Sequence, residues 1–122
     1  MALARDIVQA GLSGGTANAI QGSVKSSISA AGTVITDATD LTASFNMLST
    51  VADGAGVVTS QFLASGDTQS VFNAGANALK VYPTSGMKIN SLPANQPMLL
   101  PTSTGCLLKC VSTTRIFGIL SA

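Results

Sequence analysis

Short runs of β-branched and other apolar residues alternate with turn residues from Thr33 to the C-terminus. Residues 52–56 and 83–86 are two such turns, and the second places Pro83 at position i+1 of a type I turn that begins at Tyr82, where proline is favoured, with Gly86 directly after that turn. Strands of about four to eight residues at roughly 8–12-residue intervals are typical of sandwiches and barrels. The sequence therefore predicts a mainly β domain over residues 33–122, a small antiparallel barrel or sandwich.

The turns also separate the expected strands from one another. These are Thr33–Thr36, Leu41–Val51, Val57–Leu63, Gln69–Phe72, Leu79–Tyr82, Met87–Asn90, Met98–Leu100, Cys106–Ser112 and Arg115–Leu120. Because successive side chains of a strand point to opposite faces, Leu79 and Val81 are predicted to point into the core and Lys80 to solvent. We expect Val71 and Phe72 in the same core.

Residues 1–32 differ from the rest of the chain in being rich in Ala, Gly and Ser, with a flexible joint at residues 13–15. Apolar residues before and after this joint fall at helical spacing in thin stripes, too narrow to form a core alone. The segment is predicted to be an arm, helical in part, that becomes ordered only against a partner; a short helix packed against copies of itself is the alternative. The expected partner-binding residues are Leu3, Ile7, Val8, Leu12, Ile20, Val24 and Ile28.

Charged residues are scarce: they make up 9% of the chain, against about 25% in ordinary soluble domains. Hydrophobic residues make up 46%, and the net charge is +1. Such a surface resists self-association poorly, so the working state is expected to be an assembly. The few Lys and Arg residues are scattered, which argues against nucleic-acid binding. No apolar run is long enough for a membrane span, and Asp6 and Gln9 interrupt the apolar run that a signal peptide would need.

Two cysteines, Cys106 and Cys110, lie four residues apart in an expected strand, with Leu108 on the same face and Lys109 on the other. At that spacing in a strand they lie about 13 Å apart, beyond the reach of a disulfide. Zinc would need four ligands, and the chain has no His to complete the set. The sequence predicts two buried free thiols that serve as small apolar groups.

Enzyme chemistry is not expected, and neither is a metal or a cofactor. Without His, the usual general base and the Ser-His-Asp and Cys-His arrangements are missing. Asp37 and Asp40 are a close pair of acids, but they stand in an apparent turn; weak calcium binding is the alternative. The Gly-rich stretches lack the Lys-Ser/Thr that follows them in a phosphate loop. A Ser-Lys dyad at Lys25, with Ser23, Ser26 or Ser27, remains as an alternative for a small hydrolase.

One longer segment resembles a known family. Asn73 to Asn90 reads N-A-G-A-N-A-L-K-V-Y-P-T-S-G-M-K-I-N, and Thr50-Val-Ala-Asp-Gly-Ala-Gly-Val-Val58 precedes it. These residues resemble a small β module of tailed-bacteriophage virion proteins, among them capsid decoration (cement) proteins, head fibres and tail-associated fibres. The resemblance covers about half of the chain, and some relatives carry Trp in the last strand, where this chain has Phe117. It implies a virion location and a β module that is often trimeric.

The same segment has a reading that does not depend on the family. Gly75 is predicted to need a positive φ at a hairpin tip, with Asn73 and Asn77 bonded to local backbone groups. A sugar site lined by these two Asn residues is the functional alternative.

Together these observations predict a virion structural protein on the phage head surface, assembled in the host cytoplasm. It would be a capsid decoration protein that binds the major capsid protein and itself, as a homotrimer. The alternative is a tail, neck or fibre component that binds a carbohydrate receptor. The aromatic residues favour the first hypothesis, because they fall mostly within expected strands and burial would leave few to stack on sugars. They are Phe45, Phe62, Phe72, Tyr82 and Phe117.

Overall fold

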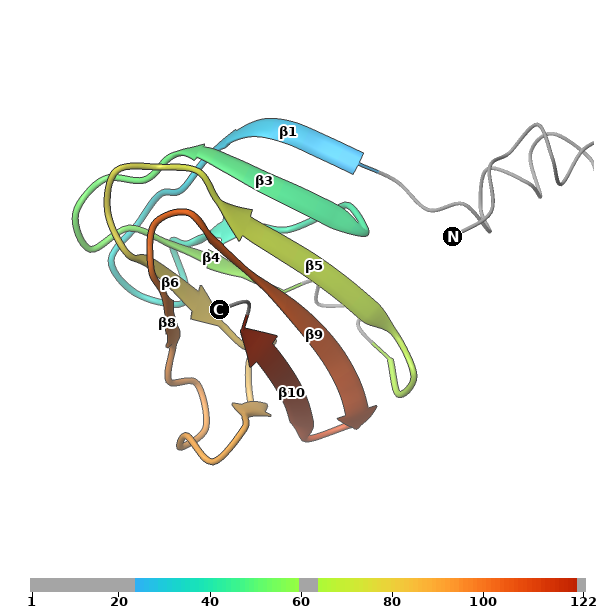
Figure 1. Ribbon diagram of the computed structural model, residues 1–122. Helices are drawn as coiled ribbons and strands as arrows, with labels where there is room; N and C mark the ends of the chain where they lie inside the picture. The colour runs from blue at the N-terminus through green and yellow to red at the C-terminus, as the bar shows by residue number, and fades with distance from the viewer. Residues whose placement is uncertain (1–23, 60–63, 121–122) are drawn as a thin grey trace, which may run out of the picture.

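The computed structural model describes residues 24–59 and 64–120 (Figure 1). These residues form strands and turns and contain no helix, so the predicted mainly β fold is confirmed. The strands are β1 (Val24–Ser29), β2 (Thr39–Asp40), β3 (Phe45–Thr50), β4 (Gly56–Val58), β5 (Thr68–Asn73), β6 (Leu79–Tyr82), β7 (Lys88–Ile89), β8 (Met98–Leu100), β9 (Thr104–Ser112) and β10 (Arg115–Leu120).

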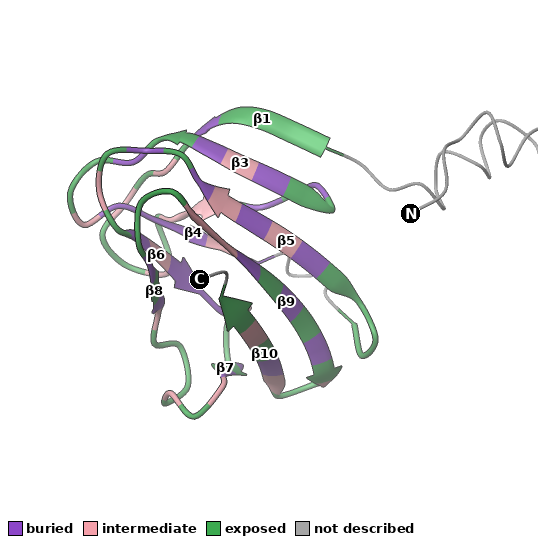
Figure 2. Cartoon of the chain, viewed as in Figure 1, coloured by how far each residue is buried: buried purple, intermediate pink, exposed green. Residues whose placement is uncertain are grey.

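The strands form two sheets that face one another across the core. The six-stranded sheet has the order β1-β3-β5-β9-β10-β7, and the four-stranded sheet has the order β2-β4-β6-β8. Along the chain β1 to β6 alternate between the two sheets, so each pair of strands makes one solenoid-like coil (Figure 1). The buried residues line the space between the sheets (Figure 2). The arrangement has the two sheets of a sandwich and is not a barrel.

Coiling explains a difference from the expected antiparallel pairing. Five of the strand pairs in the described part of the chain are parallel, and three are antiparallel. Parallel neighbours need a connection that crosses the sheet, and here the other sheet supplies that crossing instead of a helix. The last strands break the pattern, since β9 runs antiparallel between β5 and β10.

The N-terminal strand corrects a second expectation. Residues 24–29 were expected in a helical stripe of the arm, but they form β1, which pairs with β3 in the six-stranded sheet. Val24 and Ile28 are four apart, a spacing that places two side chains on one face of a strand as well as on one side of a helix. Ile28 packs in the core. Residues 1–23 of the predicted arm lie outside the described residues.

The segment after β1 also differs from the prediction. Residues 33–36 were expected to be a strand, but they turn, because the carboxylate of Asp37 accepts the backbone N–H groups of Thr33 (3.2 Å) and Val34 (3.0 Å). Asp37 is therefore a turn residue, as expected. Thr39 and Asp40 leave the turn as the short strand β2.

The core confirms most of the predicted alternation. Leu79, Val81 and Val71 are fully buried between the sheets, as are Leu108 and Cys110. Phe72 was wrongly placed in the core. It follows Val71 in β5, so its side chain points to the opposite, outer face of the six-stranded sheet.

Buried polar side chains hold the ends of the coils together. In β5, Asn73 is fully buried; its amide nitrogen donates to the carbonyls of Asn77 (2.8 Å) and Leu100 (2.9 Å). Its carbonyl oxygen accepts the N–H of Gly75 (2.9 Å). Asn77 in turn donates to the carbonyl of Val51 (2.8 Å). The predicted local bonding of Asn73 and Asn77 is confirmed, and it links three successive passes of the chain.

The predicted reason for glycine at position 75 is wrong, although glycine is indeed needed there. Gly75 does not have a positive φ, and the loop connects β5 to β6 in the other sheet and is not a hairpin tip. A Cβ at this position would lie 2.6 Å from Cγ2 and 2.8 Å from the backbone nitrogen of Val51. Glycine is needed here because two passes of backbone approach closely.

At the opposite end of the sheet a second set of amides performs the same function. Asn46 is buried, donates to the carbonyls of Ala43 (2.8 Å) and Ser70 (3.2 Å), and accepts the N–H of Ala43 (3.3 Å). Gln69 donates to the carbonyls of Leu41 (3.2 Å) and Ala43 (3.0 Å). Polar groups of the turns are thus satisfied inside the protein by inward-facing amides.

The substitution Leu79→Ala tests the core. Leu79 is fully buried in β6, so its truncation is expected to lower the free energy of unfolding by about 2–5 kcal/mol through lost contacts and a cavity. Urea unfolding followed by circular dichroism measures the change. A loss below about 0.5 kcal/mol would show that this side chain does not pack between the sheets.

Candidate protein-binding face

Large apolar side chains gather on the outer face of the six-stranded sheet. The strand register aligns Val24 with Phe45, Phe45 with Ser70, Ser70 with Leu107, and Leu107 with Ile119, so one row crosses five strands. Phe72 and Phe117 stand in the neighbouring rows. We call this set the outer apolar face: Val24, Phe45, Phe72, Leu107, Phe117 and Ile119.

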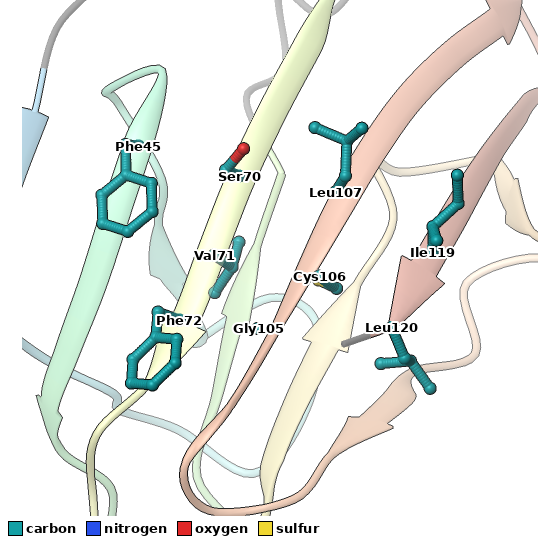
Figure 3. A pocket seen from close by; sticks show the side chains of 9 residues that line it. All are labelled: Phe45, Ser70, Val71, Phe72, Gly105, Cys106, Leu107, Ile119 and Leu120. Carbon is teal, nitrogen blue, oxygen red and sulfur yellow. The ribbon is translucent and has the colours of Figure 1, made fainter. Parts of the chain in front are cut away.

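The centre of the outer apolar face is hollowed. A shallow hollow of about 320 Å³ lies there, with Phe45, Phe72, Leu107 and Ile119 among its lining side chains (Figure 3). Ser70 and Gly105 are the small residues among them. A Cβ at Gly105 would lie 3.2 Å from Cδ2 of Phe72, so the phenyl ring covers the glycine. The hollow therefore lies where the small residues Ser70 and Gly105 stand among larger apolar side chains.

This face overturns the expectation that the aromatic residues are buried. Tyr82 is buried and donates a hydrogen bond to the carbonyl of Thr33 (3.1 Å). Phe45 and Phe117, in contrast, are 37% and 45% exposed, and Phe72 is half-buried. Phe62 lies outside the described residues. The aromatic residues therefore no longer argue against a stacking surface.

Charge is absent from the hollow and present only beside it. None of the residues that line the hollow is charged. On the outer side of the sheet, Lys109 pairs with Thr68 of β5 and Phe117 of β10. Its ammonium group donates to the carbonyl of Gly66 (2.9 Å) and to Oγ1 of Thr68 (3.3 Å), which hold it at the end of the sheet.

The edge of the sheet beside the hollow is closed by a side chain. Asn90 follows β7, and its carbonyl oxygen accepts the N–H of Gly118 (2.9 Å) while its amide nitrogen donates to the carbonyl of Gly118 (3.3 Å). The side chain thereby extends the pairing of β7 with β10 past Ile116. In the sequence Asn90 is the last residue of the motif, and its role at the sheet edge depends on Gly118, which lies opposite it in β10.

The residues predicted to bind a partner are distributed unequally. Leu3, Ile7, Val8, Leu12 and Ile20 lie outside the described residues. Val24 is exposed on β1 and belongs to the outer apolar face. Ile28 is buried among core residues, so its side chain is removed from the predicted binding set. None of the other residues of the outer apolar face was predicted to bind a partner.

Several of the side chains that could take part in catalysis or ligand binding are instead buried or hydrogen-bonded within the fold. Cys106 and Cys110 are buried and form no disulfide, as predicted. Burial raises the pKa of the Cys106 thiol from 9.0 to about 12, so this thiol is neutral at pH 7 and a poor nucleophile. In the described residues no three His, Cys, Asp or Glu side chains come together as metal ligands. The alternative of a sugar site at Asn73 is wrong, because that buried amide is bonded to the chain itself.

The described part of the chain contains no helix that could cross a membrane. Comparisons with protein-family models, with curated proteins and with solved structures found no match.

Proposed function

We propose that this chain is a non-enzymatic structural protein of a tailed-phage virion, a capsid decoration protein that binds the major capsid protein on the head surface. The resemblance of residues 73–90 to a virion β module supports this role. In the structure the matched residues are scaffold: Asn73 and Gly75 join the coils, Leu79 and Val81 fill the core, and Asn90 closes the sheet edge. The resemblance therefore concerns residues that build the framework of this fold.

The outer apolar face is the observation that supports a place within an assembly. A large side chain has an area of about 150–250 Å², so the exposed parts of these six residues amount to roughly 400–600 Å² of apolar surface. This is the upper part of the range for the largest apolar patch of a typical monomer, and such patches are often functional. A chain that works within a particle keeps such a surface covered.

The alternative role, a tail, neck or fibre component that binds carbohydrate, is favoured by the exposure of Phe45 and Phe117. Sugar recognition combines an aromatic platform with precisely placed hydrogen-bonding groups. Around the hollow, Ser70 supplies the hydroxyl group and the remaining lining side chains are apolar or a thiol. This composition suits a protein partner better than a sugar.

The copy number of the chain in purified virions separates the two roles. We expect hundreds of copies per particle, because a decoration protein repeats with the subunits of the shell. Quantitative mass spectrometry against the major capsid protein measures the number. A count of about a dozen or fewer would place the chain in the tail or neck, since those structures have low cyclic symmetry. Absence from washed particles would exclude both roles.

A further inference from the structure

We propose that the outer apolar face binds a second copy of this chain. A stable pairing of two proteins buries about 800 Å² on each partner, with an apolar centre and a polar rim. The outer apolar face supplies the centre, at roughly 400–600 Å². Thr68 and Lys109, at one end of the sheet, supply part of the rim. Self-association rests on the proposed function in one respect, since an assembled working state explains why the surface carries so little charge.

The shape of the face fits a copy of itself. Phe45 and Ile119 protrude on either side of Ser70, and Leu107 stands between Ser70 and Ile119 in the same row. Each copy therefore offers both projecting side chains and a hollow. A twofold axis would let the projections of one copy enter the hollow of the other, which is the self-complementary geometry of an isologous contact and joins two copies in place of the homotrimer predicted from the sequence.

Charge also permits a contact between identical surfaces. Identical faces bring like charges together, which is costly when the charges are buried. The hollow has no charged lining residue, and the ammonium group of Lys109 is already held by Gly66 and Thr68 at the end of the sheet. A strongly acidic partner would find no cation inside this hollow.

The two edges of the sheet favour contact through the face. Open edge strands invite pairing with another sheet, and bulges and capped edges prevent it. On β1 the register shifts between Lys25 and Ile28, and Ser27 has a positive φ of 61°. On the other edge, β7 and the side chain of Asn90 occupy β10 as far as Gly118.

Two Leu→Lys substitutions in the full-length chain test the proposal. Leu107 is 41% exposed at the hollow, whereas Leu99 is 58% exposed on β8 of the other sheet. We expect the wild-type chain to associate at micromolar concentration in sedimentation equilibrium. Leu107→Lys should weaken association by about 100-fold or more, because it buries an unpaired ammonium group. Leu99→Lys, the matched control, should associate as the wild type does.

Ile119→Lys is a second variant at the same face, and it replaces Leu107→Lys in the test if that variant does not fold. Circular dichroism shows whether each variant is folded. A monomeric wild type overturns the proposal, and so does a folded Leu107→Lys or Ile119→Lys variant that associates normally. A chain that lacks residues 1–22 should still associate; its failure to do so would mean that the N-terminal segment makes the contact instead. A monomer that nevertheless binds virions would refute self-association and leave the proposed function standing. A chain that associates with itself but does not bind particles would refute the proposed function and leave self-association standing.

Discussion

The substitution Asn73→Ala is expected to lower the free energy of unfolding by about 3–5 kcal/mol. The side chain of Asn73 is fully buried and makes three hydrogen bonds to backbone groups, of Asn77, Leu100 and Gly75. Alanine would leave these groups without the amide, and a buried unsatisfied group costs about 1–3 kcal/mol. The cost is high because water cannot readily enter this corner to replace the side chain.

Urea unfolding measures this effect, and Asn95→Ala is the matched control. Asn95 lies in an exposed loop, where its carbonyl oxygen accepts the N–H of Gly86 (2.6 Å). Water can replace that bond, but Asn95 has a positive φ of 64°, which alanine tolerates less well, so we expect the control to lose about 1–2 kcal/mol. If Asn73→Ala and Asn95→Ala lose similar amounts, the buried amide does not hold the coils together.

Local features of the fold could be read from the sequence. The alternation of Leu79, Lys80 and Val81 predicted which side chains face the core, because the two-residue period of a strand is local. The absence of a disulfide between the two cysteines followed from their spacing in one strand. Turn positions were also local, since Gly and Pro impose them on the nearest residues.

The pairing of the strands could not be read in the same way. β3 lies beside β5, with Phe45 opposite Ser70, because the intervening chain crosses to the other sheet and returns. Nothing in either strand alone specifies a parallel neighbour. The strand β1 was missed for a related reason, because a separation of four residues fits both a helix and a strand. The packing of Ile28 in the core between the sheets favours the strand over the helix.

The outer apolar face could not be predicted from the sequence, because β5 departs from the usual pattern of apolar side chains inside and polar side chains outside. This strand buries Gln69 and Asn73 and leaves Phe72 half-exposed. The amides face inward because the turns of neighbouring coils need hydrogen-bond partners inside the protein. A reading based on hydrophobicity places Phe72 in the core and the amides outside. The aromatic residue was therefore assigned to the core although it helps to form the outer apolar face.

Removal of residues 1–22 is expected to abolish attachment to the particle and leave the β domain folded. The whole of residues 1–32 was predicted to be dispensable for folding, but β1 begins at Val24 and Ile28 packs in the core. The deletion must therefore stop before β1. A chain that begins at Ser23 retains both sheets, so its urea unfolding should match that of the full-length chain.

The expected loss of attachment follows from five apolar side chains in the deleted segment: Leu3, Ile7, Val8, Leu12 and Ile20. Burial of such side chains on the shell stabilises the complex by about 1.5–3 kcal/mol each, less the entropy lost when the segment becomes ordered. Because each 1.4 kcal/mol or so changes the affinity tenfold, a net loss of a few kcal/mol weakens binding by at least about 100-fold. Co-sedimentation with particles stripped of this protein measures attachment, and a full-length chain with Asn18→Ser and Gln21→Ser is the control, since it changes polar positions of the same segment. If the truncated chain fills the particle as completely as the control, the anchor lies on the β domain, and the outer apolar face becomes the surface that grips the shell.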